Sequence, residues 1–177
     1  ESVEAIASRL RLLYRAAMAN EFQRADGQRV PKFVNLDMEE YRDLRMTVAV
    51  FTNVLSEPEF MRCSAGIVLQ AYIPDSYSIQ KELTAWAKRR VEAGGAPIKL
   101  RIVKGANLAM EQVEASLQGW PQAPYDNKND VDANYKRMIL YGCTAENTRS
   151  VRLGVASHNL FDIAFAMLAR SENSVED

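Results

Sequence analysis

The chain has 177 residues, of which 47% are hydrophobic, and it carries a formal net charge of -1. These values are typical of one ordinary soluble domain, and the lack of a basic surplus gives no support to nucleic-acid binding. No apolar stretch approaches the roughly 20 residues that a membrane span needs, and the first residues, ESVEAIASRL, show no signal-peptide pattern. We therefore expect a cytoplasmic protein.

The two cysteines, Cys63 and Cys143, lie far apart and neither belongs to a CxxC pair. This spacing supports neither a zinc site nor a disulfide framework, and we predict no metal site. Both cysteines are expected to be buried thiols.

Helical and strand patterns alternate along the chain. Apolar residues at intervals of three and four predict an amphipathic helix over about residues 2–20, and a polar loop follows it. A short apolar run at 33–37 predicts a parallel strand covered on both faces, with a helix after it from about 39 to 56. The other predicted elements are strands at 66–72, 98–104 and 151–156, helices from Ser76, over about 107–117 and around Tyr135, and an extra loop at 121–130.

The first three predicted strands begin 33 and 32 residues apart, the length of one strand, loop, helix and loop, and an extra loop and helix precede the fourth. Such a repeat predicts right-handed βαβ units, and no GxGxxG motif follows a strand, which disfavours a doubly wound dinucleotide fold. Four βα units are half of an eight-stranded barrel, which typically takes about 250 residues. We expect residues 1–177 to form the central segment of a (β/α)8 TIM-like barrel of the α/β class. A freestanding four-stranded α/β sandwich is the alternative.

Polar residues suited to chemistry accompany the ends of all four apolar runs. Asp37 follows the first, Gln70 follows the second, Arg101 and Lys104 lie in the third, and His158 comes after the fourth. Because (β/α) barrels keep their active sites at the carboxyl ends of the strands, we expect these side chains on one common face. The arrangement predicts an enzyme.

Asp37 and Arg101 each allow two interpretations. A guanidinium within the apolar strand KLRIV needs an anionic partner, so Arg101 would bind either Asp37 in a structural ion pair or an anionic ligand. Asp37 could orient a cationic substrate group or an arginine. Alternatively, it caps a helix that begins at Met38, Glu39 and Glu40.

The second and third strands end in groups suited to a planar ligand with phosphate. Gln70 offers a donor and an acceptor to the edge of a heterocycle, or else it satisfies neighbouring backbone groups. The segment from Lys104 to Asn107 leads into the N-terminus of a helix, a geometry that favours phosphate. Lys104 could instead form a Schiff base, as in aldolases.

His158 is the only histidine of the chain. Alone it would more often cap or pack against a helix than contact a ligand, but Ser157 and Asn159 beside it favour ligand contact. Lys128, in the polar segment DNKND, is by default a solvated charge.

Six segments together carry a family resemblance. In chain order they are NLDMEEYRDL, GIVLQAYIPDS, KLRIVKGAN, VEASLQGWPQAPY, DANYKRM and VASHN. From Phe33 to Asn159 the chain resembles the proline dehydrogenase barrel, particularly the form fused to an aldehyde dehydrogenase in bacterial bifunctional proline-utilisation proteins. The resemblance implies a distorted (β/α)8 barrel, of which this chain supplies strands three to six. It also implies non-covalent FAD and the oxidation of L-proline to Δ1-pyrroline-5-carboxylate by hydride transfer.

The resemblance further implies roles for individual residues. Asp37 and Arg101 match the acidic and basic positions of the family's reaction centre. The partners would be L-proline, a quinone electron acceptor and a C-terminal aldehyde dehydrogenase module, in a cytoplasmic protein that associates with the inner face of the membrane. The positions that match FAD contacts are Met38, Gln70, Val103, Lys104, Gly105, Ala106, Lys128, Ser157, His158 and Asn159.

Departures from the family pattern limit what this chain would do alone. Asn107 stands where some branches have an aromatic residue, and Asp126 stands where others have a threonine. The lysine on the second strand and the paired arginines after the eighth strand, which bind proline in the family, have no counterpart here. We therefore expect the isolated chain neither to retain FAD nor to oxidise proline.

Two other functions are compatible with the sequence. A lyase could use Lys104 as a Schiff-base amine, although such an enzyme has no need of Gln70 or Arg101. A non-catalytic scaffold would use Asp37 and Arg101 only as a structural ion pair.

Overall fold

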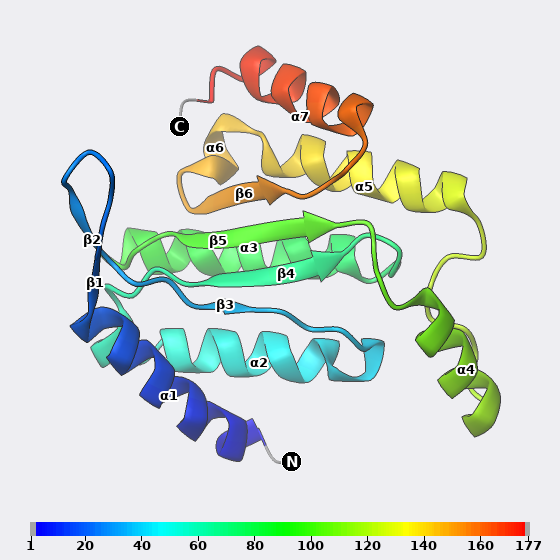
Figure 1. The fold of residues 1–177 in the computed structure, drawn as a ribbon, viewed down its shortest axis with the longest axis horizontal. Coiled ribbons are helices and arrows are strands. Elements are labelled where there is room, and N and C mark those ends of the chain that lie inside the picture. Colours follow the sequence, from blue (N-terminus) through cyan, green and yellow to red (C-terminus); the bar gives the residue numbers. More distant parts are fainter. Residues whose placement is uncertain (1–2, 176–177) are drawn as a thin grey trace.

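A computed structural model describes residues 3–175 as a parallel sheet with helices packed against it (Figure 1). The four strands lie side by side in sequence order, as they do in a segment of a (β/α)8 barrel. This confirms the predicted fold class. The strands are β3 (Asn35–Leu36), β4 (Gly66–Gln70), β5 (Ile98–Val103) and β6 (Val151–Val155).

Helices between the strands cover one face of this sheet, because each parallel connection has to cross over it. Figure 1 shows α3 and α5 on one side of the sheet, where α3 contacts β4 and α5 contacts β5. The residues of β5 at positions 98, 100 and 102 are buried. No helix within residues 3–175 has the length and apolar character needed to cross a membrane. The main helices are α1 (Val3–Ala19), α2 (Leu44–Leu55), α3 (Ser76–Glu92), α4 (Leu108–Gln118), α5 (Lys128–Gly142) and α7 (Leu160–Glu172).

The other face of the sheet, which we call the open face, is covered less completely than the sequence predicts. All five residues of β4 are buried, as expected, but the burial of β5 alternates, and Lys99 and Arg101 are exposed. The expectation that Arg101 lies embedded in a doubly covered strand is therefore wrong. Alternation reflects helices that lie on one side only, so every second side chain of β5 faces away from them.

Segment 33–43 differs from its predicted structure. The first strand is reduced to Asn35–Leu36, and the helix expected from residue 39 begins only at Leu44, after a 3-10 turn at Tyr41–Asp43. Asp37 therefore caps no helix, and that interpretation is wrong. The physical reason is a tertiary contact: the side-chain amide of Gln70 binds the carbonyls of Met38 and Glu39 and holds this segment out of the helix.

The structure differs from the prediction in two further segments. The polar loop after α1 is an antiparallel hairpin of β1 (Glu21–Gln23) and β2 (Arg29–Pro31), whose strands are too short to show an alternating pattern. Lys128 is the first residue of α5 rather than part of a loop, because the side chain of Asn127 accepts a hydrogen bond from Asp130 N and caps the helix. A short helix, α6 (Ala145–Thr148), was not predicted.

Arg90, near the amino ends of the strands, is buried, and no salt bridge joins it to a carboxylate within residues 3–175. Burial lowers the pKa of its guanidinium. The guanidinium instead donates to backbone carbonyls of the surrounding turns, and two of these, at Phe60 and Met61, also accept from the backbone amides of Cys63 and Ala96. The carbonyls that accept from Arg90 belong to Leu55, to Phe60 and Met61 at 2.8 Å each, and to Cys63 and Ala96 at 3.0 Å each.

Cys63 and Cys143 are both free and buried, which confirms the prediction of buried thiols. Burial raises the pKa of each thiol. A thiol with a raised pKa is a poor nucleophile, so both residues contribute packing rather than chemistry.

Candidate active site

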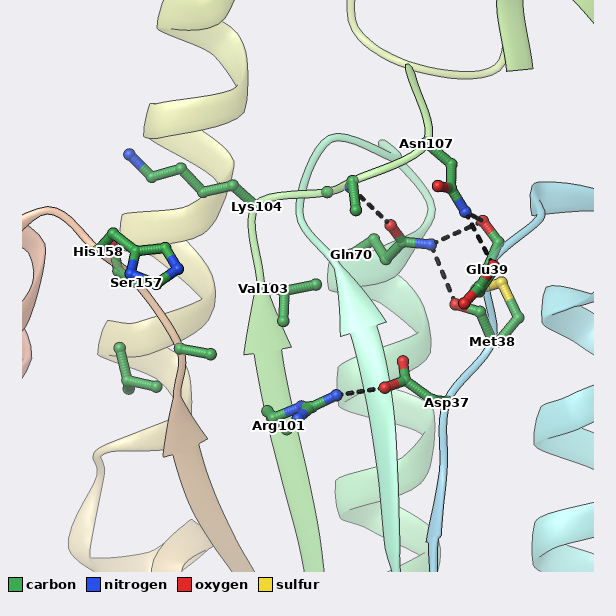
Figure 2. A pocket seen from close by; sticks show the side chains of 14 residues that line it. Asp37, Met38, Glu39, Gln70, Arg101, Val103, Lys104, Asn107, Ser157 and His158 are labelled. Atoms are coloured by element: carbon green, nitrogen blue, oxygen red, sulfur yellow. Dashed lines mark hydrogen bonds and ion pairs between the residues drawn. The ribbon is translucent and has the colours of Figure 1, made fainter. Parts of the chain in front are cut away.

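A cavity of about 690 Å³ opens at the carboxyl ends of the four strands (Figure 2). The structure thus brings together all but two of the residues predicted for the site, and Lys128 and Asn159 lie outside the lining. Sequence reasoning did not assign Glu39 or Asn107 to the site, although both line the cavity. The predicted residues that line it are Asp37, Met38, Gln70, Arg101, Val103, Lys104, Gly105, Ala106, Ser157 and His158.

Arg101 and Asp37 form an ion pair across the open face of the sheet, between Arg101 Nη2 and Asp37 Oδ2 (Figure 2). Arg101 stands opposite Val68 of the intervening strand, so its side chain crosses that strand to reach Asp37. The two side chains are 45% and 53% exposed. An ion pair this exposed contributes about 0–1 kcal/mol to stability. The pair therefore stabilises the fold only weakly, and both charged side chains remain accessible from the cavity.

Gln70 serves backbone groups on both sides of the cavity. Its Nε2 donates to the carbonyls of Met38 and Glu39, each at 3.1 Å, and its Oε1 accepts from Ala106 N at 3.3 Å. The side chain is buried, so its main work in this structure is to tie the segment after β3 to the loop after β5. The amide of Ala106 is consequently engaged and is not a free phosphate donor.

Asn107 adds a second tie to the same segment. Its Nδ2 donates to the Glu39 carbonyl at 3.2 Å and lies 3.5 Å from Glu39 Oε2 (Figure 2). This residue stands where some branches of the resembled family have an aromatic side chain. In this chain the amide of Asn107 binds Glu39 at the edge of the cavity and adds no apolar surface to it.

Gly105 allows the loop after β5 to pass directly over an aromatic ring. Its φ of +140° is rarely adopted by residues with a side chain, and a Cβ atom here would lie 2.4 Å from Tyr72 Cδ1. Burial, the largest influence, raises the pKa of Tyr72 to about 12, so this ring is a neutral surface at physiological pH. The glycine is therefore required by both backbone conformation and space.

Lys104 directs its ammonium toward two carboxylates on neighbouring helices. Nζ lies 2.6 Å from Asp132 Oδ1 and 2.8 Å from Asp162 Oδ2, and 5.4 Å from the centre of the Tyr135 ring. Burial pulls the pKa of Lys104 down, but the hydrogen bonds with Asp132 and Asp162 outweigh it and leave the pKa above its ordinary value. Lys104 is thus held as a cation.

The same two carboxylates gather three other predicted site residues. Lys128 pairs with Asp132, and the Ser157 hydroxyl donates to Asp162 Oδ2 at 2.9 Å. Asn159 N donates to Ser157 Oγ at 3.0 Å. Sequence reasoning missed Asp132 and Asp162. The spacing of Lys128 and Asp132 by four residues on one helix was the available signal for the first, and no local signal marked the second.

His158 and Ser157 lie on the side of the cavity formed by the segment after β6 (Figure 2). Asn159 instead caps α7, because its Oδ1 accepts from Phe161 N at 2.9 Å. Ser157 and His158 therefore line the cavity, whereas Asn159 starts the next helix. Residues 3–175 contain no group of three or more His, Cys, Asp or Glu side chains arranged to hold a metal ion.

The sequence profile of the family described as proline dehydrogenase matches residues 2–177. The chain belongs to the proline dehydrogenase family. A search of curated protein sequences found no match. The resemblance inferred from the six segments is thereby confirmed at the level of the family.

Solved structures of Proline Utilization A (PutA) proteins share the fold. Proline Utilization A (PutA) from Corynebacterium freiburgense is 51% identical with a TM-score of 0.88, and the match covers 98% of this chain and 17% of that one. PutA from Bdellovibrio bacteriovorus, inactivated by N-propargylglycine, is 38% identical with a TM-score of 0.85 and the same coverage of 98% and 17%. The chain therefore spans only 17% of the length of these proteins.

A mutant PutA from Bradyrhizobium japonicum is 20% identical with a TM-score of 0.80, and the match covers 96% of this chain and 16% of that one. At this identity the likeness concerns the fold alone. It extends the same arrangement of strands and helices to a distant sequence.

Members of the proline dehydrogenase family use a flavin, and the cavity suits one. Val103, Val155 and Ala156 offer apolar surface for a planar ring, while Arg101 places a cation beside it. The volume of about 690 Å³ lies within the range of pockets that hold small molecules, roughly 300–1,000 Å³. The residues present therefore fit a flavin ring.

Proposed function

We propose that this chain forms part of the active-site wall of an FAD-dependent proline dehydrogenase, which oxidises L-proline to Δ1-pyrroline-5-carboxylate. The observation that carries the proposal is the Asp37 and Arg101 pair, exposed on the wall of a cavity at the carboxyl ends of the strands. Bound FAD would supply the acceptor for the hydride that leaves proline. The chain's own contribution is to bind, orient and stabilise charge.

Arg101 has the chemistry to favour negative charge that arrives with the hydride. A guanidinium keeps its charge at any physiological pH, and within a closed cavity such a fixed charge acts more strongly than in water. Asp37 orients Arg101 by accepting its hydrogen bond, and its carboxylate faces the same cavity. Both roles remain predictions that rest on this geometry.

A second hollow supports FAD rather than a shorter flavin. It has a volume of about 280 Å³, shares Lys104 and Gly105 with the larger cavity, and is lined by Lys128, Tyr72 and Tyr125 among others. We propose that the ring of FAD occupies the larger cavity and that the rest of the cofactor passes toward Lys128. A cationic side chain and two aromatic rings suit phosphate and a nucleoside.

The Schiff-base lyase is disfavoured by the surroundings of Lys104. An amine must lose its proton before it attacks a carbonyl, and Asp132 and Asp162 hold Lys104 in the protonated form, with a raised pKa. Attack would also require the ammonium to leave both carboxylates.

The remaining proposals concern the complete protein. The resemblance supports L-proline as substrate, a quinone as electron acceptor, a C-terminal aldehyde dehydrogenase module, and a cytoplasmic protein that associates with the inner face of the membrane. The greater length of the PutA neighbours leaves room for such a module. We further propose that the isolated segment neither retains FAD nor oxidises proline, and sustained proline-dependent dye reduction by the purified segment would contradict this.

Substitution of Arg101 in the complete protein tests the function. Arg101→Met should lower kcat/KM for proline on the order of 10²-fold while the melting temperature changes little, because the lost interaction acts on developing charge. Arg45→Met is the matched control, since Arg45 forms a pair with Glu82 at 2.8 Å that is also exposed and lies outside the cavity. Intact proline oxidation in Arg101→Met would favour the scaffold interpretation and remove the proposal.

A further inference from the structure

The ammonium of Lys104 is surrounded by groups from two helices that follow it in the chain. Asp132 and Tyr135 come from α5, and Asp162 comes from the first turn of α7. Lys104 itself belongs to the loop that lines the cavity after β5. The contacts therefore fasten a cavity loop to the helices behind it.

We propose that Asp162 is a positioning residue, which sets the Lys104 loop and the turn after β6 in place around the cofactor cavity. The inference rests on the proposed function, because the positioned loops are those assigned to flavin binding. It concerns a residue that does not line the cavity. Asp162 would act only through Lys104 and Ser157.

One oxygen atom of Asp162 joins the two loops. Oδ2 lies 2.8 Å from Lys104 Nζ and accepts the Ser157 hydroxyl at 2.9 Å, and Ser157 Oγ in turn accepts from Asn159 N. The loop after β5 and the turn after β6 thus share a single anchor. Tyr135 reinforces it, since its hydroxyl donates to the Ala156 carbonyl at 2.9 Å.

Of the two carboxylates, Asp132 is bound less exclusively to Lys104. Its side chain is 25% exposed and divides its oxygens between Lys104 and Lys128, whereas the Asp162 side chain is only 6% exposed. A buried carboxylate is costly unless a cation and hydrogen bonds compensate it, and a buried ion pair adds little net stability. We therefore assign to the buried Asp162 carboxylate the placement of the two loops rather than a gain in stability.

The side-chain charge of Lys104 is consequently fixed away from Gln70 and Asp37, and Figure 2 shows it extending toward the side of Ser157 and His158. What the loop presents to the cavity around Gln70 is backbone at Gly105 and Ala106. If the anchor is lost, this backbone should move relative to His158, and a flavin should bind less well.

The test is FAD titration of the complete apoprotein, followed by the quenching of flavin fluorescence. Asp162→Asn keeps the shape of the side chain and an acceptor for Ser157 but removes the charge that holds Lys104. We expect the affinity for FAD to fall about tenfold or more. At saturating FAD the KM for proline should stay within about twofold, because the anchor does not contact substrate. Glu146→Gln is the control, since it removes the carboxylate from a surface lysine, Lys88, and should change neither value.

A double-mutant cycle separates action through Lys104 from a general structural effect. If Asp162 acts through Lys104, adding Asp162→Asn to Lys104→Met should lower FAD affinity by less than about twofold more. The double variant removes both charges, so no uncompensated charge remains buried and the cycle survives a poorly folding single variant. Ser157→Ala should lower affinity about threefold by cutting the second tie.

Wild-type affinity in Asp162→Asn, or fully additive losses in the double variant, would overturn the inference. Failure of the unmodified complete protein to bind FAD or to oxidise proline would instead overturn the proposed function. The two failures are therefore distinguished by the unmodified protein alone.

Discussion

Arg90 and Lys104 are cations near opposite ends of the sheet, and the protein surrounds them differently. Arg90 donates to backbone carbonyls and to the Met61 sulfur, but to no carboxylate among residues 3–175, and burial lowers its pKa. Lys104 meets two carboxylates, which raise its pKa despite burial. Arg90 thus supplies hydrogen-bond donors to carbonyls of the turns, whereas the two carboxylates hold Lys104 in place.

The difference follows from the chemistry of the two side chains. The guanidinium offers five donors in a fixed fork, which suits several carbonyls that converge from separate turns. The ammonium is a compact charge on a flexible stem, so carboxylates are needed to fix its position. We infer that the Arg90 end of the sheet serves stability, whereas the Lys104 end serves binding.

The largest expected effect on stability comes from Arg90. Arg90→Met should lower the free energy of unfolding of the complete protein by about 3 kcal/mol or more, because the carbonyls of Leu55, Cys63 and Ala96 lose the donor that Arg90 supplies. Arg90→Lys should recover only part of the loss, since an ammonium cannot reach the same set of carbonyls. Urea denaturation measures both variants. A loss below about 1 kcal/mol in Arg90→Met would show that water replaces the guanidinium.

Two glycines sharpen the comparison at a smaller scale. Gly94 (φ +85°), near the Arg90 end, has nothing within 4 Å of an added Cβ, whereas at Gly105 (φ +140°) the Cβ would meet the Tyr72 ring at 2.4 Å. Gly94→Ala should cost about 1 kcal/mol from backbone strain alone, and Gly105→Ala about 2–3 kcal/mol from strain and collision together. Denaturation gives both costs.

The two glycine variants should also differ in their affinity for FAD. It should fall in Gly105→Ala and stay unchanged in Gly94→Ala, because only Gly105 lines the cavity. Equal costs and equal affinities in the two variants would contradict the assignment of separate tasks to the two ends.

Much of the cavity lining could be predicted from sequence because parallel strands place their carboxyl ends along one edge. Asp37, Gln70 and His158 end or follow a short apolar run and Arg101 lies within one, and this local signal is enough to bring them together. Their roles in catalysis stay predictions.

The contacts behind the cavity could not be predicted in the same way. Asp132 and Asp162 lie on helices, where an acidic residue is usually solvated, and only the packing of α5 and α7 brings both to Lys104. The failed helix cap at Asp37 has a similar cause, since Gln70, distant in sequence, determines the conformation after β3. Long-range contacts overrule local preference in both places.

The smallest expected effect is a difference in pH dependence. The hydrogen bond with Lys104 is the largest influence that lowers the pKa of Asp132 below its ordinary value of 3.8, and Lys128 adds to it. A carboxyl with a lowered folded-state pKa contributes stability above pH 3.8 and loses that contribution as pH falls through the folded-state value. Asp132→Asn should therefore cost about 1 kcal/mol at neutral pH, and this cost should disappear in acid.

The cost of Arg90→Met should instead stay constant between neutral and acid pH. The titratable groups that act on Arg90 are Cys63 and Tyr14, and burial raises the pKa of both, so neither changes its charge over this interval. Urea denaturation at a series of pH values compares the two variants with the unmodified protein. A parallel decline in both costs would mean that carboxylates stabilise the two ends alike, whereas a decline in Asp132→Asn alone ties acid sensitivity to the end of the sheet that bears the cavity.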